Sequence, residues 1–138
     1  MAESNQRGLW TLRILSAILL FATGGLHLFL VFNGTGGILG VAFILNAIAG
    51  LVLGIAMLVL RGRLLQWATV LSLLFLIATL GALVLALTIG LFGITQTWDF
   101  TLVPQTVIVE SIGIVVLAVT TVLVFRERPD ERVRPSVA

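Results

Sequence analysis

Long apolar segments alternate with short polar or glycine-rich breaks along the chain. Each segment reaches the roughly 20 residues that an α-helix needs to cross a bilayer. The breaks contain Asn-Gly and Gly-Gly pairs, arginines, or a mixed loop that ends in Pro104, a residue suited to the first turn of a helix. The pattern predicts an all-α fold: an antiparallel bundle of four transmembrane helices in a single domain, residues 1–125, followed by a charged cytoplasmic tail, 126–138. The expected spans are about 10–32, 38–60, 64–93 and 105–125.

The arginines predict how the bundle is oriented. All eight basic residues fall beside the spans on one side of the four-span arrangement: Arg7, Arg13, Arg61, Arg63, Arg126, Arg128, Arg132 and Arg134. The opposite loops, 33–37 and 94–104, contain no Lys or Arg and a single acidic residue, Asp99. Because cytoplasmic loops carry the excess of basic residues, we expect both termini in the cytoplasm and the loop with Trp98 outside. The first apolar run is longer than the roughly 7–15 residues of a signal-peptide core, so we expect it to remain as a span.

Composition agrees with a multi-pass protein of the bacterial inner membrane. The 138 residues are 59% hydrophobic and 10% charged, with a mean hydropathy of +1.21, whereas a soluble domain carries about 25% charged residues. The formal charge of +2 follows from topology and implies no nucleic-acid partner. The absence of cysteine excludes disulfides, thiolate metal sites and covalent c-type haem.

Small residues four apart predict where the helices meet, because close backbone approach drives helix association in lipid. The second span contains two GxxxG pairs, with Asn46 four residues before the second pair, and the third span carries a stripe of alanines. We expect these stripes to face a neighbouring helix and to pack against each other; homodimerisation through one stripe is the alternative. The packing residues are Gly36, Gly40, Gly50, Gly54, Ala82 and Ala86.

Only two ionisable side chains, His27 and Glu110, lie well inside the predicted spans. Each is six residues from the outer end of its span, or roughly 9 Å deep at the helical rise per residue. A carboxylate in hydrocarbon is costly, by about 2.5–3.5 kcal/mol, so Glu110 is expected to face the bundle or be protonated. We expect His27 to point into the bundle toward the fourth span and pair with Glu110, while Asn46, Thr88 and Asp99 complete a polar site that opens outward.

Several roles are open to the His27 and Glu110 side chains. The two side chains could form a purely structural pair between the first and fourth helices, or His27 could cap a buried carbonyl. A proton- or substrate-handling site is the functional alternative, because intramembrane His and Glu recur in relays and transporters. A metal or haem site would need further ligands, from Asp99 or from a second subunit.

Several phrases are similar to a known group of proteins: HLFL near the end of the first span, GILGVAFILNAIAG in the second, GLFGI closing the third and VE in the fourth. In this order they resemble small, uncharacterised four-helix integral membrane proteins of GC-rich bacteria such as actinobacteria, and the layout is similar to that of DoxX-like proteins. The resemblance covers residues 10–125; the TQTWDF loop and the arginine-rich tail depart from it. It implies the fold and no activity.

Residues typical of helix packing outnumber residues able to carry out chemistry, and the sequence lacks the common catalytic motifs. The leading hypothesis is therefore a non-enzymatic accessory or assembly subunit of a larger bacterial membrane complex, in contact with lipid and with a membrane protein partner or copies of itself. The alternative is a small oligomeric transporter or ligand-binding protein with an outward-facing site of His27, Glu110 and Asn46. The third hypothesis is metal or haem binding; no cofactor is strongly implied.

Overall fold

The computed structural model describes residues 2–127, which are helical over most of their length. Within these residues the order of elements is α1 (Ala2–Phe32), α2 (Gly37–Val59), α3 (Gly62–Thr88) and α4 (Val103–Arg126). All four helices are long and apolar enough to cross a membrane. The predictions of an all-α fold and of four such helices are confirmed. Most of the predicted tail, residues 128–138, lies outside the described residues.

Two helix boundaries differ from the expected spans. α1 begins at Ala2, well before 10, and includes a polar first turn in which Glu3 is favourably placed at the positive end of the helix dipole. α3 ends at Thr88, before the expected 93, because Gly90 takes a positive φ of 90° and its N–H bonds back to Leu85 O at 2.8 Å. Glycine adopts this conformation without the penalty a Cβ imposes, so it ends the helix although the sequence stays apolar.

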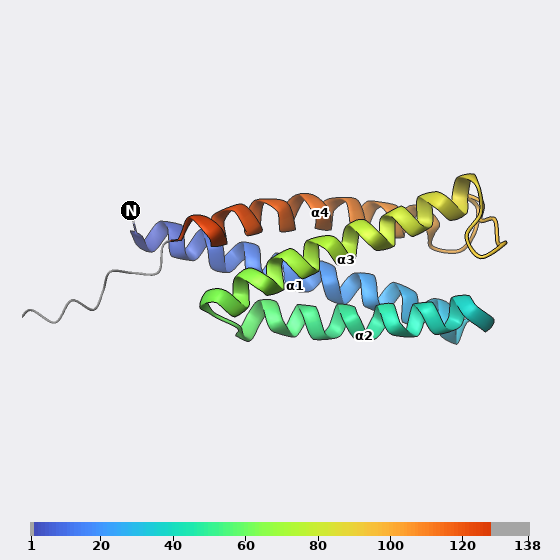
Figure 1. Ribbon diagram of the computed structural model, residues 1–138, viewed down its shortest axis with the longest axis horizontal. Helices are drawn as coiled ribbons and strands as arrows, with labels where there is room; N and C mark the ends of the chain where they lie inside the picture. The colour runs from blue at the N-terminus through green and yellow to red at the C-terminus, as the bar shows by residue number, and fades with distance from the viewer. Residues whose placement is uncertain (1, 128–138) are drawn as a thin grey trace, which may run out of the picture.

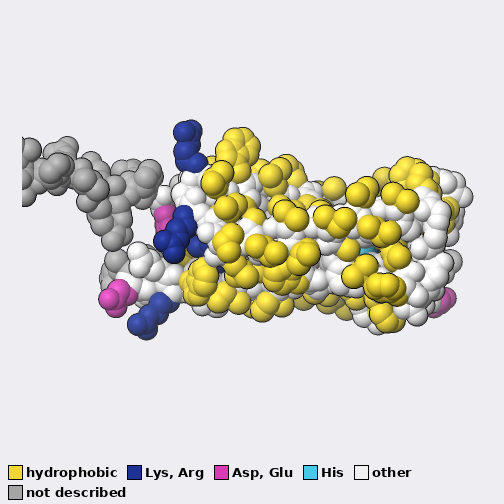
Figure 2. All heavy atoms as spheres, turned by 90° about the horizontal axis from the view of Figure 1, so that it is seen from below, with side chains coloured by type: hydrophobic (Ala, Val, Ile, Leu, Met, Phe, Trp, Pro, Cys, Tyr) yellow, Lys and Arg dark blue, Asp and Glu magenta, His cyan; other side chains and the backbone are white. Residues whose placement is uncertain are grey.

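The connections define two ends of the molecule (Figure 1). The start of α1, the α2–α3 connection and the end of α4 lie at one end, called here the terminal end. The α1–α2 turn (33–36) and the α3–α4 loop (89–102) lie at the other, the loop end. Arginine side chains gather near the terminal end, and apolar side chains cover the middle of the surface (Figure 2).

The closest helix contact joins α1 to α2 through glycines. A Cβ on Gly50 would come within 2.7 Å of Leu20 O and 3.2 Å of Gly24 Cα, and one on Gly54 would collide with the Phe21 ring. Both positions are buried, so the two backbones approach as closely as small residues allow. Gly50 and Gly54 therefore pack against α1.

The other small residues of the expected stripes have different surroundings. Gly40 faces Thr35 O of the adjoining turn, and Gly36 has open space around it. Ala82 and Ala86 of α3 line a cavity. The suggested pairing of the α2 and α3 stripes is wrong for Gly50 and Gly54, because α1 places its own glycine, Gly24, at the crossing with α2.

Arg13 of α1 holds the last turn of α2 at the terminal end. Its Nε donates to Met57 O at 2.8 Å, and one Nη donates to Leu60 O at 2.8 Å and Leu58 O at 3.3 Å. These carbonyls belong to the end of a helix, where backbone acceptors lack intrahelical partners and the dipole favours a cation. The guanidinium also lies 5.0 Å from the centroid of the Trp10 ring.

The interior alternates polar and apolar layers along its length. Near the terminal end, Ser16 and Thr120 are fully buried, and their hydroxyls are 3.2 Å apart. Leu20, Leu76 and Leu117 are also fully buried and, by helical spacing, occupy the middle of the bundle. We call these three residues the leucine layer. The polar side chains Thr23, His27 and Glu110 lie on the loop-end side of it.

Candidate functional site

A cavity of about 380 Å³ lies in the loop-end half, chiefly between α2 and α3. These two helices connect at the terminal end and diverge toward the loop end (Figure 1). Most of the lining is aliphatic or aromatic, with a few neutral polar side chains. The lining residues are His27, Leu30, Leu39, Ala42, Phe43, Asn46, Phe75, Ala78, Thr79, Ala82, Leu83, Ala86, Leu91, Phe92, Ile94, Gln96, Phe100, Thr101, Val103 and Thr106. We refer to it as the loop-end cavity.

The α3–α4 loop covers this cavity. Leu91 and Ile94 exchange backbone hydrogen bonds of 2.8 and 2.9 Å, which close a tight turn whose central residues are Phe92 and Gly93. Gln96 N–H bonds to Ala86 O at 2.8 Å and ties the loop to the last turn of α3. The loop is therefore folded back onto the helix ends as an ordered cover.

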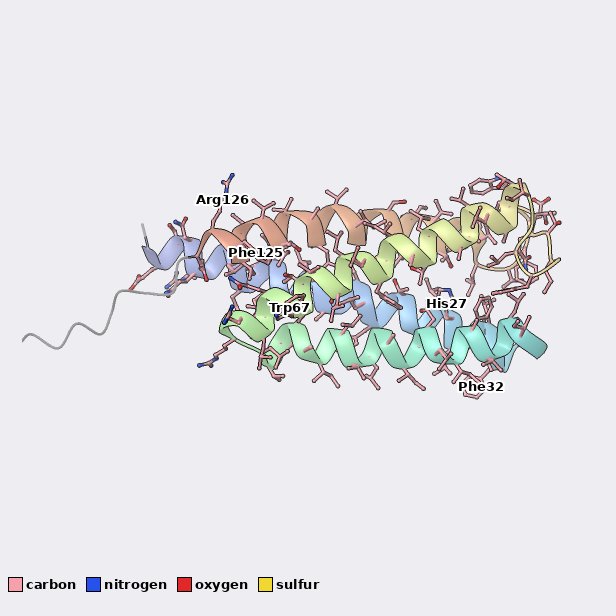
Figure 3. The ribbon with its side chains drawn as sticks, viewed as in Figure 1. His27, Phe32, Trp67, Phe125 and Arg126 are labelled. Carbon is pink, nitrogen blue, oxygen red and sulfur yellow. The ribbon has the colours of Figure 1, made fainter. Side chains whose placement is uncertain are left out.

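His27 lies in the wall of the cavity, as the only histidine of the chain. Its ring projects from α1 into the region between α2 and α3 (Figure 3). Nδ1 lies 2.8 Å from Thr23 O of the preceding turn, and the ring meets Phe43 of α2 in an edge-to-face contact with centroids 4.9 Å apart. Since a carbonyl only accepts, Nδ1 carries the proton, and in the neutral ring Nε2 is an acceptor.

Asn46 lies one turn along α2 from Phe43 and also lines the cavity. Its Oδ1 is buried and has no hydrogen-bond partner within residues 2–127. The side chain is half-buried, and its amide nitrogen is not among the sealed atoms of the described residues. The structure thus places His27 and Asn46 on the lining of one cavity.

Glu110 is fully buried one turn below Thr106 and does not line the cavity. Thr79 lies beside its carboxyl group. However, the Thr79 hydroxyl donates to Leu76 O at 3.1 Å, and neither carboxyl oxygen accepts a hydrogen bond within the described part of the chain. Thr79 and Thr106 therefore separate Glu110 from the cavity.

The expected pairing of His27 with Glu110 is wrong. The bond from Nδ1 to Thr23 O fixes the ring against its own helix, and the ring packs on Phe43 of α2 rather than reaching α4. Burial of His27 inside the bundle agrees with the prediction. The prediction depended on equal depth and on the cost of an unpaired carboxylate in hydrocarbon, and neither determines the direction in which a side chain points.

The remaining candidates, Asp99 and Thr88, lie outside this site. Asp99 is exposed in the α3–α4 loop, and Thr88 is exposed with its hydroxyl on Val84 O of its own helix at 2.7 Å. Sequence reasoning missed the other polar residues of the lining, which are Thr79, Gln96, Thr101 and Thr106. For Thr106 a signal was available, since it lies one helical turn from Glu110 on the same face.

The described residues contain no cluster of three His, Cys, Asp or Glu side chains able to hold a metal ion. No family model matches the chain, and neither a curated protein nor a solved structure matches it.

Proposed function

We propose that this chain is a multi-pass protein of the bacterial cytoplasmic membrane that binds a small apolar molecule in the loop-end cavity. The observation that carries the proposal is the cavity itself. Its volume of about 380 Å³ lies in the range of roughly 300–1,000 Å³ typical of small-molecule sites, which are mostly apolar with a few placed polar groups. By comparison with a cavity of about 150 Å³ that holds benzene, it has room for about fifteen non-hydrogen atoms.

The proposed orientation is that of an antiparallel bundle with both termini in the cytoplasm and the cavity in the outer half. Arg61, Arg63 and Arg126 are exposed at or near the terminal end, in keeping with a cytoplasmic face. Phe125 and Trp67 project from the surface of the half that includes the terminal end (Figure 3). Aromatic side chains in such positions support an interface near that end.

A lateral entry from the bilayer fits the way the cavity is built. Its walls are α2 and α3, which contact each other least among the adjoining helix pairs. Seen from the side of α2, part of the histidine is visible between apolar side chains (Figure 2). An apolar molecule dissolved in the hydrocarbon would reach the cavity between these helices without crossing water. The lining extends no further toward the terminal end than Asn46 and Phe75, which favours binding over transport.

Mass spectrometry of the intact protein, released from detergent micelles after incubation with n-tridecane, dodecyl methyl ether or 1-dodecanol, tests the proposal. Wild-type protein is expected to retain one molecule of at least one probe. Ala82→Phe fills the cavity and should abolish retention. Val84→Phe, on the exposed face of the same helix, should leave retention unchanged. Equal retention by both variants, or no retention by a folded wild type, would refute the proposal.

The accessory-subunit hypothesis stays a prediction, because apolar side chains on the surface of the four helices suit lipid as well as a protein partner. Metal or haem binding and the resemblance to DoxX-like proteins stay predictions too.

A further inference from the structure

The lining of the loop-end cavity carries no Arg, Lys, Asp or Glu side chain; its polar members are His27, Asn46, Gln96 and three threonines. An ion transferred into such a site would lose its hydration without gaining an opposite charge, which costs several kcal/mol. The cavity therefore favours a neutral ligand, and the chemistry of that ligand depends on the hydrogen bonds still open to it.

His27 offers an acceptor. Its Nδ1 is occupied by Thr23 O at 2.8 Å, which leaves Nε2 of the neutral ring without a proton. Nε2 makes no hydrogen bond to any residue in 2–127, and it is not sealed from the cavity as the unpartnered Asn46 Oδ1 is. A ligand atom that binds here must donate a proton.

Asn46 offers a donor close by. The contact of His27 with Phe43 and the approach of Gly24 to Ala47 O place the two helices against each other on either side of Asn46. Asn46 lines the same cavity as His27, and its amide nitrogen, unlike Oδ1, is not sealed. A ligand atom beside this nitrogen must accept.

We propose that the loop-end cavity binds a neutral apolar alcohol, whose hydroxyl donates to His27 Nε2 and accepts from the Asn46 amide. The inference rests on the proposed function and names the ligand class for the same site. A hydroxyl satisfies both groups with one atom, since it is donor and acceptor together. An ether or a ketone can only accept and would leave Nε2 unpaired, and an alkane satisfies neither group.

Competition between 1-dodecanol and dodecyl methyl ether for the wild-type protein, followed by mass spectrometry of the intact protein in detergent, tests the alcohol assignment. One hydrogen bond lost in a buried site corresponds to about a tenfold loss of affinity. We therefore expect the alcohol to bind about tenfold more tightly than the ether. Equal affinities, with both probes still excluded by Ala82→Phe, would overturn the alcohol assignment while the proposed function survives. If neither probe nor n-tridecane binds the folded wild type, both fail.

Two variants locate the hydroxyl. His27→Phe keeps an aromatic ring against Phe43 and removes Nε2, and Asn46→Leu replaces the amide by an apolar group of similar size. Each should reduce the preference for the alcohol over the ether to about threefold or less. Thr88→Val, outside the cavity with its hydroxyl bonded to its own helix, should keep the full preference. A preference unchanged in Asn46→Leu would overturn the assignment even where His27→Phe does not fold.

Discussion

The two ends of the bundle differ in how far the polar side chains of the interior are hydrogen-bonded. At the terminal end, Arg13 gives three hydrogen bonds to the last carbonyls of α2, and Ser16 and Thr120 bond to each other. At the loop end, His27 Nε2, Asn46 and Glu110 have no partner within residues 2–127. The first arrangement holds helices together, while the second leaves hydrogen-bonding capacity open. The same four helices thus provide a clamp at one end and the proposed binding site at the other.

The asymmetry is also visible in the buried oxygens that lack a partner. Of the five such side-chain atoms in the described residues, only Ser72 Oγ lies on the terminal-end side of the leucine layer; the other four are Thr23 Oγ1, Asn46 Oδ1 and both carboxyl oxygens of Glu110. Most buried polar groups in proteins are hydrogen-bonded, so a group of exceptions calls for an explanation. The proposed ligand would pair with His27 Nε2 and the Asn46 amide nitrogen, but it explains none of these oxygens, because Asn46 Oδ1 is sealed from the cavity and Thr23 and Glu110 do not line it.

The largest effect is expected from breaking the clamp. Arg13→Leu leaves the carbonyls of Met57, Leu58 and Leu60 without their charged donor, and hydrogen bonds to charged groups contribute about 1.5–3 kcal/mol each. We expect the free energy of unfolding to fall by about 3 kcal/mol, measured by denaturation in mixed detergent micelles.

Arg7→Leu is the matched control, since Arg7 is exposed on the same helix, and it should change the free energy of unfolding by less than about 0.5 kcal/mol. Equal losses in the two variants would show that net charge near the terminal end, and not the clamp, stabilises the bundle.

A change of opposite sign is expected from Glu110→Leu. Removing a buried carboxyl group whose oxygens have no partner relieves a desolvation cost of about 1–3 kcal/mol, and leucine is close to glutamate in size. The free energy of unfolding should rise by about 1 kcal/mol in the same denaturation assay, and retention of 1-dodecanol should not change. A less stable Glu110→Leu protein would mean that the contact with Thr79 stabilises the fold as a hydrogen bond.

The number and type of the helices were predictable because hydrophobic length is a property of sequence alone. In an apolar solvent the backbone groups of each apolar run must hydrogen-bond within a helix. Four runs of the required length, separated by turn-forming residues, therefore predict four helices. The end of α3 was less predictable, since the apolar run continues through Leu91 and Phe92 and only the backbone conformation of Gly90 ends the helix.

The site was predictable in part. His27 and Asn46 were found because polar side chains inside a span are costly and mark interior positions. The depth of Glu110 in the bundle could also be predicted from the sequence. The direction in which its side chain points depends on the rotation of α4 about its axis, and that rotation is determined by helix packing rather than by residue spacing. Arg13 was interpreted only as a topological signal, although its role depends on carbonyls at the end of another helix, more than 40 residues away in the sequence.

The smallest and most selective effect is expected at the cover of the cavity, where Phe92 has a φ of 52° and Gly93 a φ of 75°. A two-residue turn with both φ values positive favours Asn-Gly, whereas a bulky residue at the first position costs roughly 1 kcal/mol. Phe92→Asn should therefore raise the free energy of unfolding by about 0.5 kcal/mol.

Because Phe92 also lines the cavity, loss of its ring should speed the dissociation of 1-dodecanol several-fold, measured by exchange against deuterated dodecanol. Phe92→Ala separates the two effects: it should speed dissociation without the gain in stability. If Phe92→Asn instead held the alcohol as long as the wild type, the loop would serve only as a connection, and the contrast between a clamped end and a binding end would depend on His27 and Asn46 alone.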